Sequence, residues 1–379
     1  MQMIKNYLKK NSIFLALFLI YLPLFKYFVE LNNNKGHSFM TAEWLINYKY
    51  GFINRGLIGT LFISMTRNPD LLLDIISVSL ICLYLLIFYF LNKIFHQNKQ
   101  NIISIILIFS PAIFLFPIYD SQGAFRKEIV GLLSLLIFAV YVKNKNIKFL
   151  YFSAAIYTVG IFSHTVNLFF LTTILILFYK HIPSKIKQAL IFIVPTLSYF
   201  LIYFLFSPSE PESYVIRDKM CDYLRELDLY NLCGHGSFDY VVWDINAAYL
   251  ITQNIVINER RPEYYFYIFL FFIALIPFLF DKSVFREKTS YLFVGISFMP
   301  LFLLAFDWGR WINIMLTCYL IIFLLSNKEE INKRVSLFLI PFPILFRIEH
   351  CCDPIFQFNI DYILNNINYL IWNFQNIFI

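Results

Sequence analysis

The chain has 379 residues, of which 59% are hydrophobic and 15% charged, and its formal net charge is +7. A soluble fold of this composition would expose large apolar patches, so an ordinary globular protein is excluded. The apolar residues form long runs instead of the alternating segments of about ten residues found in a transmembrane β-barrel. The basic residues are scattered in twos and threes, which argues against a nucleic-acid-binding stripe. The sequence therefore predicts an all-α, polytopic transmembrane bundle.

A hydrocarbon core of roughly 30 Å is crossed by about 17 to 25 mostly apolar helical residues. On this basis we predict one integral membrane domain over residues 1–379, with about eleven spans and a range of ten to twelve. In chain order the spans are 11–29, 71–92, 101–118, 128–142, 148–163, 165–179, 189–206, 264–281, 289–306, 311–326 and 335–348. The first run has no small-residue cleavage site, so we expect an uncleaved anchor. The fourth, fifth, sixth and eleventh are short, and one of them is a candidate half-span.

The lysines and arginines of the short loops indicate orientation, because cytoplasmic loops carry an excess of them. If the amino terminus is inside, every inside segment holds two or three Lys or Arg, whereas the short outside segments are less uniformly basic. We therefore predict a cytoplasmic amino terminus and an extracytoplasmic loop at 207–263. This loop contains Cys221 and Cys233, which an oxidising compartment would allow to pair; two unpaired thiols are the alternative.

The carboxyl-terminal segment, 353–379, has apolar residues at helical spacing opposite several asparagines. This pattern is typical of an amphipathic helix lying on the membrane interface, and a twelfth span is the alternative.

Five polar clusters lie at the outer ends of the predicted spans, where charges are costly and tend to mark sites. Residues 43–59 combine aromatic residues, glycines and Arg55, and would lie along the interface. Residues 120–128 place Arg126 and Lys127 at the start of a helix, which suggests a diphosphate clamp. The structural alternatives are an aromatic anchor for the first cluster and a solvated turn for the second.

The other three clusters are short. His164 lies between two apolar runs and is either a helix cap or a proton-transfer group. Residues 307–311 pair an acid with an arginine at helical spacing, and the alternative is a lone interface salt bridge. Residues 347–350 end the eleventh predicted span and form the fifth candidate cluster. The alternative is that Arg347 only extends to the lipid headgroups and has no further role.

Together these clusters bring cations, carboxylates and an imidazole to one membrane face. A lipid diphosphate donor requires this combination, because cations neutralise the departing diphosphate and an acid or imidazole takes a proton from the acceptor hydroxyl. The predicted catalytic candidates are His164, Asp307 and Glu128, and the predicted substrate-binding residues are Arg126, Lys127, Arg310, Arg55, Asp120, Arg347 and His350. The sequence has no metal-binding or nucleotide-binding motif, so we expect metal-independent chemistry without a cofactor.

The chain resembles the Wzy-type polymerases of O-antigen and capsule, which are multi-span proteins of similar size with a long outside loop. The strings that carry the resemblance are Asn47-Tyr48, Gly51-Phe52, Arg55-Gly56-Leu57 and Phe306-Asp307-Trp308-Gly309-Arg310-Trp311. The resemblance implies polymerisation of undecaprenyl-diphosphate-linked repeat units into lipopolysaccharide O-antigen or capsule, at the outer face of the bacterial cytoplasmic (inner) membrane. The implied partners are this lipid-linked glycan, membrane lipid, a chain-length regulator and a flippase, with no nucleic acid. The loop 207–263 would cover the glycans.

Two other classes stay open. A GT-C-type glycosyltransferase, which uses a polyprenyl-phosphate sugar, typically has an acidic residue in its first outside loop, where this chain has Glu43. A flippase or transporter should carry ionisable residues within its spans, and here the span interiors are nearly free of them apart from Asp74. An O-acyltransferase and a non-catalytic assembly subunit also remain open.

Overall fold

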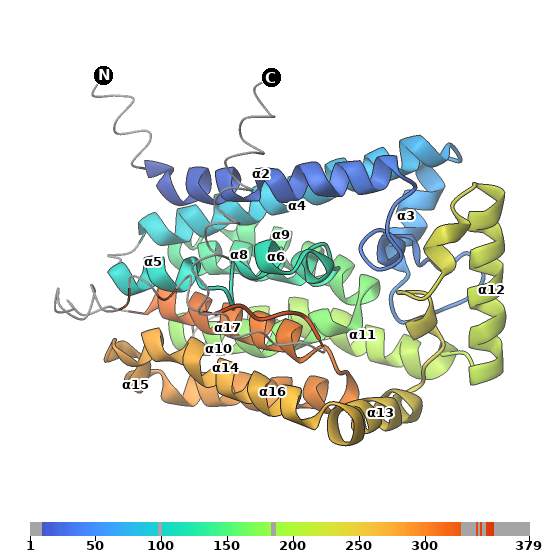
Figure 1. The fold of residues 1–379 in the computed structure, drawn as a ribbon. Coiled ribbons are helices and arrows are strands. Elements are labelled where there is room, and N and C mark those ends of the chain that lie inside the picture. The colour runs from blue at the N-terminus through green and yellow to red at the C-terminus, as the bar shows by residue number, and fades with distance from the viewer. Residues whose placement is uncertain are drawn as a thin grey trace. The chain divides into compact units, whose positions relative to one another are not determined.

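The computed structural model describes residues 10–97, 101–182, 187–326, 339, 342 and 346–351. Within these ranges all regular structure is helical and no strand occurs (Figure 1). The chain divides into two compact units, each built from separate stretches of sequence. The first unit comprises 1–27, 98–124 and 252–379, and the second comprises 28–97 and 125–251. The all-α prediction is confirmed for the described residues.

The second unit is built around α8 (Glu128–Asn144), whose side chains are almost all buried. This helix is apolar all round and contains no proline, so it is suited to being enclosed by other helices. The helices that pack against it are α4 (Pro69–Gln97), α9 (Ile147–Ser163) and α10 (Phe170–His181). Two further helices, α3 (Leu57–Met65) and α11 (Leu190–Phe206), pack against α9.

The first unit has α17 (Trp308–Leu325) as its most buried helix. The helices packed against α17 are α5 (Ile102–Ile108), α14 (Arg261–Leu279) and α16 (Lys288–Leu304). Short helices α6 (Phe116–Tyr119), α7 (Ser121–Ala124) and α15 (Ser283–Arg286) complete the connections. Helix α2 (Ser12–Asn33) begins in this unit and ends in the second.

Five of the described helices are long and apolar enough to cross a membrane. These are Ser12–Asn33, Pro69–Gln97, Lys187–Phe206, Arg261–Leu279 and Trp308–Leu325. Shorter apolar helices cover Ile147–Ser163, Thr165–His181 and Lys288–Leu304. The polytopic helical class thus agrees with the prediction, while the count of eleven spans and the orientation stay predictions. The eleventh predicted span, 335–348, falls largely outside the described residues, as the segment 353–379 does entirely.

The third predicted span, 101–118, is wrong as a continuous helix. Helix α5 ends at Ile108, turns follow, and α6 begins only at Phe116. Pro111 explains the break, because proline has no N–H to donate and disfavours the helical conformation of the residue before it, here Ser110.

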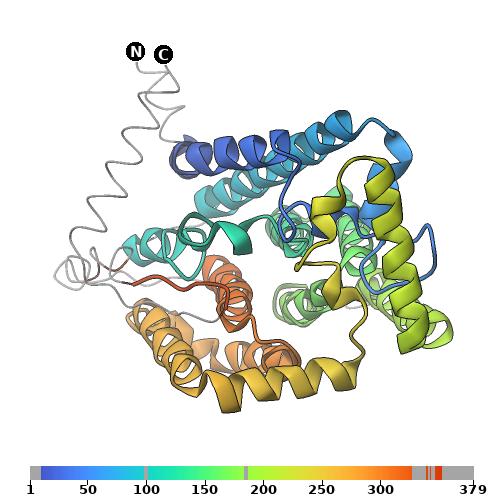
Figure 2. The ribbon, with the colours of Figure 1, turned by 45° about the vertical axis from the view of Figure 1, so that its right-hand side comes forward.

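The long loop predicted at 207–263 is folded rather than extended. It contains α12 (Glu210–Glu226), the short turns η4 (Tyr230–Cys233) and η5 (Asp239–Val241), α13 (Ile245–Gln253) and the π-helical turn η6 (Asn254–Glu259). Helix α12 begins with a capping box in which Ser209 and Glu212 exchange side-chain and backbone contacts. We call residues 207–243 the cap; it lies beside α3 and the segment before α3 (Figure 1, Figure 2).

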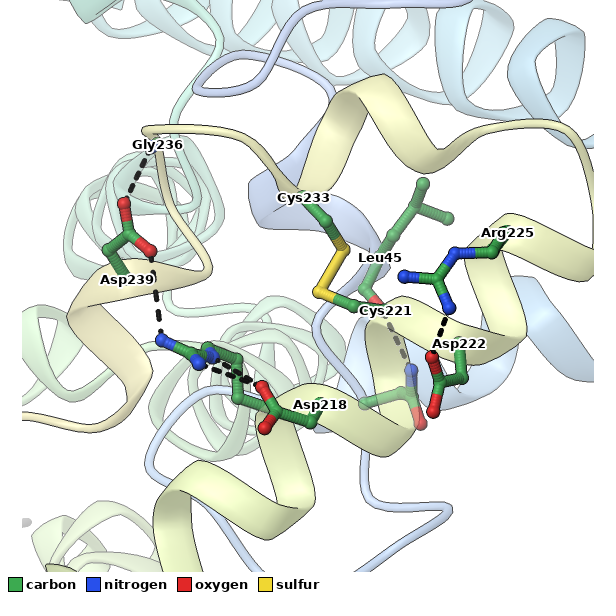
Figure 3. The surroundings of a disulfide bond; sticks show 10 residues. Leu45, Asp218, Cys221, Asp222, Arg225, Cys233, Gly236 and Asp239 are labelled. Carbon is green, nitrogen blue, oxygen red and sulfur yellow. Dashed lines mark hydrogen bonds and ion pairs between the residues drawn. A yellow bond between two sulfur atoms is a disulfide. The ribbon is translucent and has the colours of Figure 1, made fainter.

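A disulfide closes the cap: Cys221 and Cys233, the pair that the sequence suggested, are joined, with their Cα atoms 5.7 Å apart. Figure 3 shows the bridge linking α12 to the turn η4.

Candidate functional site

The centre of the candidate site in the second unit is Glu43, which is fully buried in the turn η1 (Ala42–Leu45). Its carboxylate lies 2.7 Å from Nε of Arg126 and 3.2 Å from Nε2 of His164. Three polar clusters that are far apart in the sequence therefore meet at one carboxylate. Buried charges are costly unless they are paired, and this pairing offsets the cost.

The neighbours of Glu43 hold it in place. Trp44 is 1% exposed, and its indole N–H donates to the carbonyl of Phe125 at 2.7 Å, which ties η1 to the residue before Arg126. The start of α3 packs closely on the same loop, because a Cβ atom on Gly59 would lie 1.9 Å from the carbonyl oxygen of Ile46. Only glycine permits this approach.

Both ring nitrogens of His164 face a neighbouring group. It directly follows the last residue of α9, and its Nδ1 accepts a hydrogen bond from the N–H of Val166 at 3.1 Å. In the neutral ring the proton is then on Nε2, the nitrogen that faces Glu43. Burial lowers the pKa of His164 and outweighs the opposite influence of Glu43. The imidazole is therefore neutral near pH 7, and its Nε2 faces the carboxylate at 3.2 Å.

Lys127 is a further ionisable group of this site, and it is fully buried. Its Nζ donates to the carbonyl oxygen of Arg55 at 2.6 Å. Burial lowers the pKa of Lys127 to about 7, with Glu43 acting in the opposite direction. An anion placed near Nζ would raise this pKa and favour the charged form of the amine.

Asn167 is a residue that sequence inspection missed. Its Oδ1 accepts from the N–H of Gly131 on α8 at 3.0 Å, and its Nδ2 donates to the carbonyl of Gly160 on α9 at 2.9 Å. These bonds fix the ends of the helices that carry Lys127 and His164. The only sequence signal for Asn167 was a polar residue soon after the histidine, within an apolar run.

The cap holds the segment that precedes Glu43. Ser237 donates its N–H to the carbonyl of Ser38 at 2.9 Å and its hydroxyl to the carbonyl of Phe39 at 3.1 Å. Lys35 forms an ion pair with Asp228 at 2.9 Å. The cap therefore contacts the main chain only a few residues before the buried acid.

The cap also holds the segment that follows Glu43. The Nζ atom of Lys49 lies 3.8 Å from the centre of the Tyr223 ring, within the range of a cation–π contact. Arg55 donates to the carbonyl of Tyr240 at 3.4 Å. Both flanks of Glu43 are thus fastened to a cap that the disulfide closes.

Glu128, a predicted catalytic residue, also belongs to the second unit, where it is the buried first residue of α8. The other predicted site residues, Asp120, Asp307, Arg310, Arg347 and His350, belong to the first unit. Arg310 pairs with Asp307, and both the backbone N–H and Nδ1 of His350 contact Asp120, the latter at 2.6 Å. Burial by itself would raise the pKa of Asp120, but the hydrogen bonds and charge of His350 outweigh it, so the pKa is lowered. Arg347 pairs with Glu349 at 2.8 Å. This unit therefore has an acid–cation cluster of its own.

The arrangement around Glu43 suits proton transfer next to an anion. A carboxylate is oriented by a neutral imidazole, and Arg126 and Lys127 supply positive charge beside it. Among the described residues, no group of three or more His, Cys, Asp or Glu side chains is arranged to hold a metal ion. Comparison of the chain with protein-family models, curated proteins and solved structures gave no match.

Proposed function

We propose that the chain is a membrane glycosyltransferase that uses a sugar linked to polyprenyl phosphate, with Glu43 as the catalytic base. The observation that carries the proposal is the contact of Glu43 with both Arg126 and His164 inside one unit. This acid lies in the first predicted outside segment, where a GT-C-type enzyme would carry its acidic residue.

Each side chain of the site has a role in the proposed reaction. The acceptor hydroxyl gives its proton to the carboxylate of Glu43 as its oxygen bonds to the anomeric carbon of the donor sugar. The bond from that carbon to the phosphate oxygen breaks, and its electron pair leaves with the phosphate. Arg126 and Lys127 stabilise the charge that develops on the phosphate. His164 is a positioning residue, because its Nε2–H holds the carboxylate.

Lys127 is suited to this step because its charge adjusts to the ligand. A phosphate near Nζ raises the pKa of Lys127 from its lowered value of about 7, so the amine takes up a proton when the anion binds. The positive charge then appears when the leaving group requires it.

A direct test replaces Glu43 by Gln, which keeps the shape of the side chain and removes the basic carboxylate. We expect transfer of labelled sugar from polyprenyl phosphate to acceptor, measured in membranes of the source organism, to fall by roughly 10²-fold or more. Glu226→Gln is the matched control, because Glu226 is exposed on the cap. A stably folded Glu43→Gln variant with wild-type transfer would refute the assignment.

The second candidate is the polymerase of undecaprenyl-diphosphate-linked repeat units. The acid–cation cluster of the first unit favours it, because a polymerase handles two lipid-linked substrates and needs a second set of polar groups. Arg310→Gln separates the two proposals. A polymerase variant should lose long chains from the surface-polysaccharide ladder, whereas a single-sugar transferase without a role for Arg310 should keep its product.

A further inference from the structure

Three aromatic rings lead from the surface of the cap to the Glu43–Arg126 pair. The ring centres of Trp243 and Tyr240 are 4.7 Å apart, and those of Tyr240 and Phe39 are 6.3 Å apart. Cζ of Arg126 lies 5.9 Å from the centre of the Phe39 ring. We call Phe39, Tyr240 and Trp243 the aromatic row. It ends at the guanidinium that binds the proposed base.

The row differs from the aromatic residues that form the core of the second unit. Trp44 and Phe125, next to the same site, are fully buried, whereas the three rings of the row are half-buried. Each ring therefore presents part of its surface outside the protein interior.

Polar groups border the row on the cap. Asp239, adjacent to Tyr240 in the chain, accepts from the N–H of Gly236 at 3.3 Å and lies 4.0 Å from Arg217. Figure 3 shows the carboxylate of Asp239 directed toward Gly236. Carboxylate and guanidinium groups beside aromatic faces offer hydrogen bonds to hydroxyls and an apolar surface to C–H groups.

We propose that the aromatic row is the subsite for the sugar rings of the acceptor glycan. One face of a pyranose ring carries several C–H groups, and these pack favourably on the electron-rich face of an aromatic ring. Tyr and Trp provide such contact area with little loss of side-chain freedom. A glycan lying along the row would bring its terminal hydroxyl toward Glu43. This inference rests on the proposed glycosyl transfer, because that reaction defines the acceptor.

The test measures sugar binding separately from transfer. The probe is the water-soluble glycan released by mild acid from the lipid-linked oligosaccharides of the source organism, and binding to the purified full chain is measured by titration calorimetry. The released glycan has no phosphate or lipid, so it reports on sugar recognition alone. We expect Trp243→Leu and Phe39→Leu to weaken binding roughly 10-fold each, since they keep apolar bulk but remove the aromatic face.

Two controls accompany these variants. Tyr230→Leu removes a cap tyrosine that is 50% exposed and lies under Arg225 instead of in the row, so its affinity for the glycan should stay at the wild-type value. Glu226→Gln changes an exposed acid on the cap and should likewise bind the glycan normally and keep wild-type transfer. Phe39→Leu serves as the second variant should Trp243→Leu fail to fold.

The outcomes are separable. Wild-type affinity in folded Trp243→Leu and Phe39→Leu, or no glycan binding by the wild-type chain, would overturn the subsite. Full transfer activity in Glu43→Gln, together with weakened glycan binding in Trp243→Leu, would overturn Glu43 as the base and leave the subsite standing.

Discussion

The buried pair of Glu43 and Arg126 makes the strongest prediction about stability. The side chain of Glu43 is 0% exposed and that of Arg126 is 9% exposed, so removing either partner leaves a charge with little access to water. Breaking a buried pair in this way costs roughly 3–5 kcal/mol. We therefore expect Glu43→Gln and Arg126→Met each to lower the free energy of unfolding by about that amount.

The double variant isolates the pair. Glu43→Gln with Arg126→Met removes both charges, and such replacements of a whole buried pair are often nearly neutral. Gln at position 43 keeps an oxygen that accepts the Nε2–H of His164, so this second contact is retained in every variant of the cycle. The double variant should thus be less destabilised than the sum of the single variants by about 2 kcal/mol or more.

The assay is unfolding of the purified chain in detergent micelles, followed by circular dichroism during titration with a denaturing detergent. Glu226→Gln again serves as the control for the loss of one exposed acid. Additive single effects, or a Glu43→Gln variant as stable as the wild type, would show that the two side chains do not form an energetically coupled buried pair.

Three further predictions concern other parts of the structure. Lys127 has a folded-state pKa of about 7 against an ordinary 10.5, so between these values the unfolded state binds more protons and stability should rise with pH; Lys127→Met should flatten this slope in pH-dependent unfolding. Replacing Cys221 and Cys233 by Ser should cost about 3 kcal/mol, measured as faster proteolysis of the cap. Asp120→Asn removes the charged acceptor for His350, and hydrogen exchange at 346–351 should quicken by roughly tenfold.

The predicted site residues show which features of the site can be predicted from local sequence patterns and which cannot. Charged residues at the ends of apolar runs were identifiable from the sequence because charges are costly inside a membrane. Because Arg126 and Lys127 are adjacent at a helix start, we predicted that they act together as a diphosphate clamp. In the structure Arg126 contacts Glu43, and Lys127 donates to a main-chain carbonyl. Neighbours in the chain therefore have different partners, because successive residues at a helix start point in different directions.

The break at Pro111 shows the opposite case, in which a local signal outweighed composition. Hydropathy alone predicts a continuous helix over 101–118, whereas the proline ends α5 and separates it from α6. The missing N–H and the restriction on Ser110 were present in the sequence. A long apolar run therefore indicates that a segment prefers an apolar environment. It does not show that the segment forms one continuous helix.

The helical class could be predicted from the amino-acid sequence by itself, since runs of apolar residues can satisfy their backbone groups in lipid only as helices. Five of the described helices are long and apolar enough to cross a membrane. The sequence also suggested a disulfide between Cys221 and Cys233, because both residues lie in the loop that was predicted to be extracytoplasmic. Only the tertiary structure decided that Glu43, Arg126 and His164 meet, and that the cap fastens both flanks of the acid. Such contacts depend on how α8, α9 and the turn η1 pack, and side-chain packing between distant segments leaves no periodic pattern in the chain.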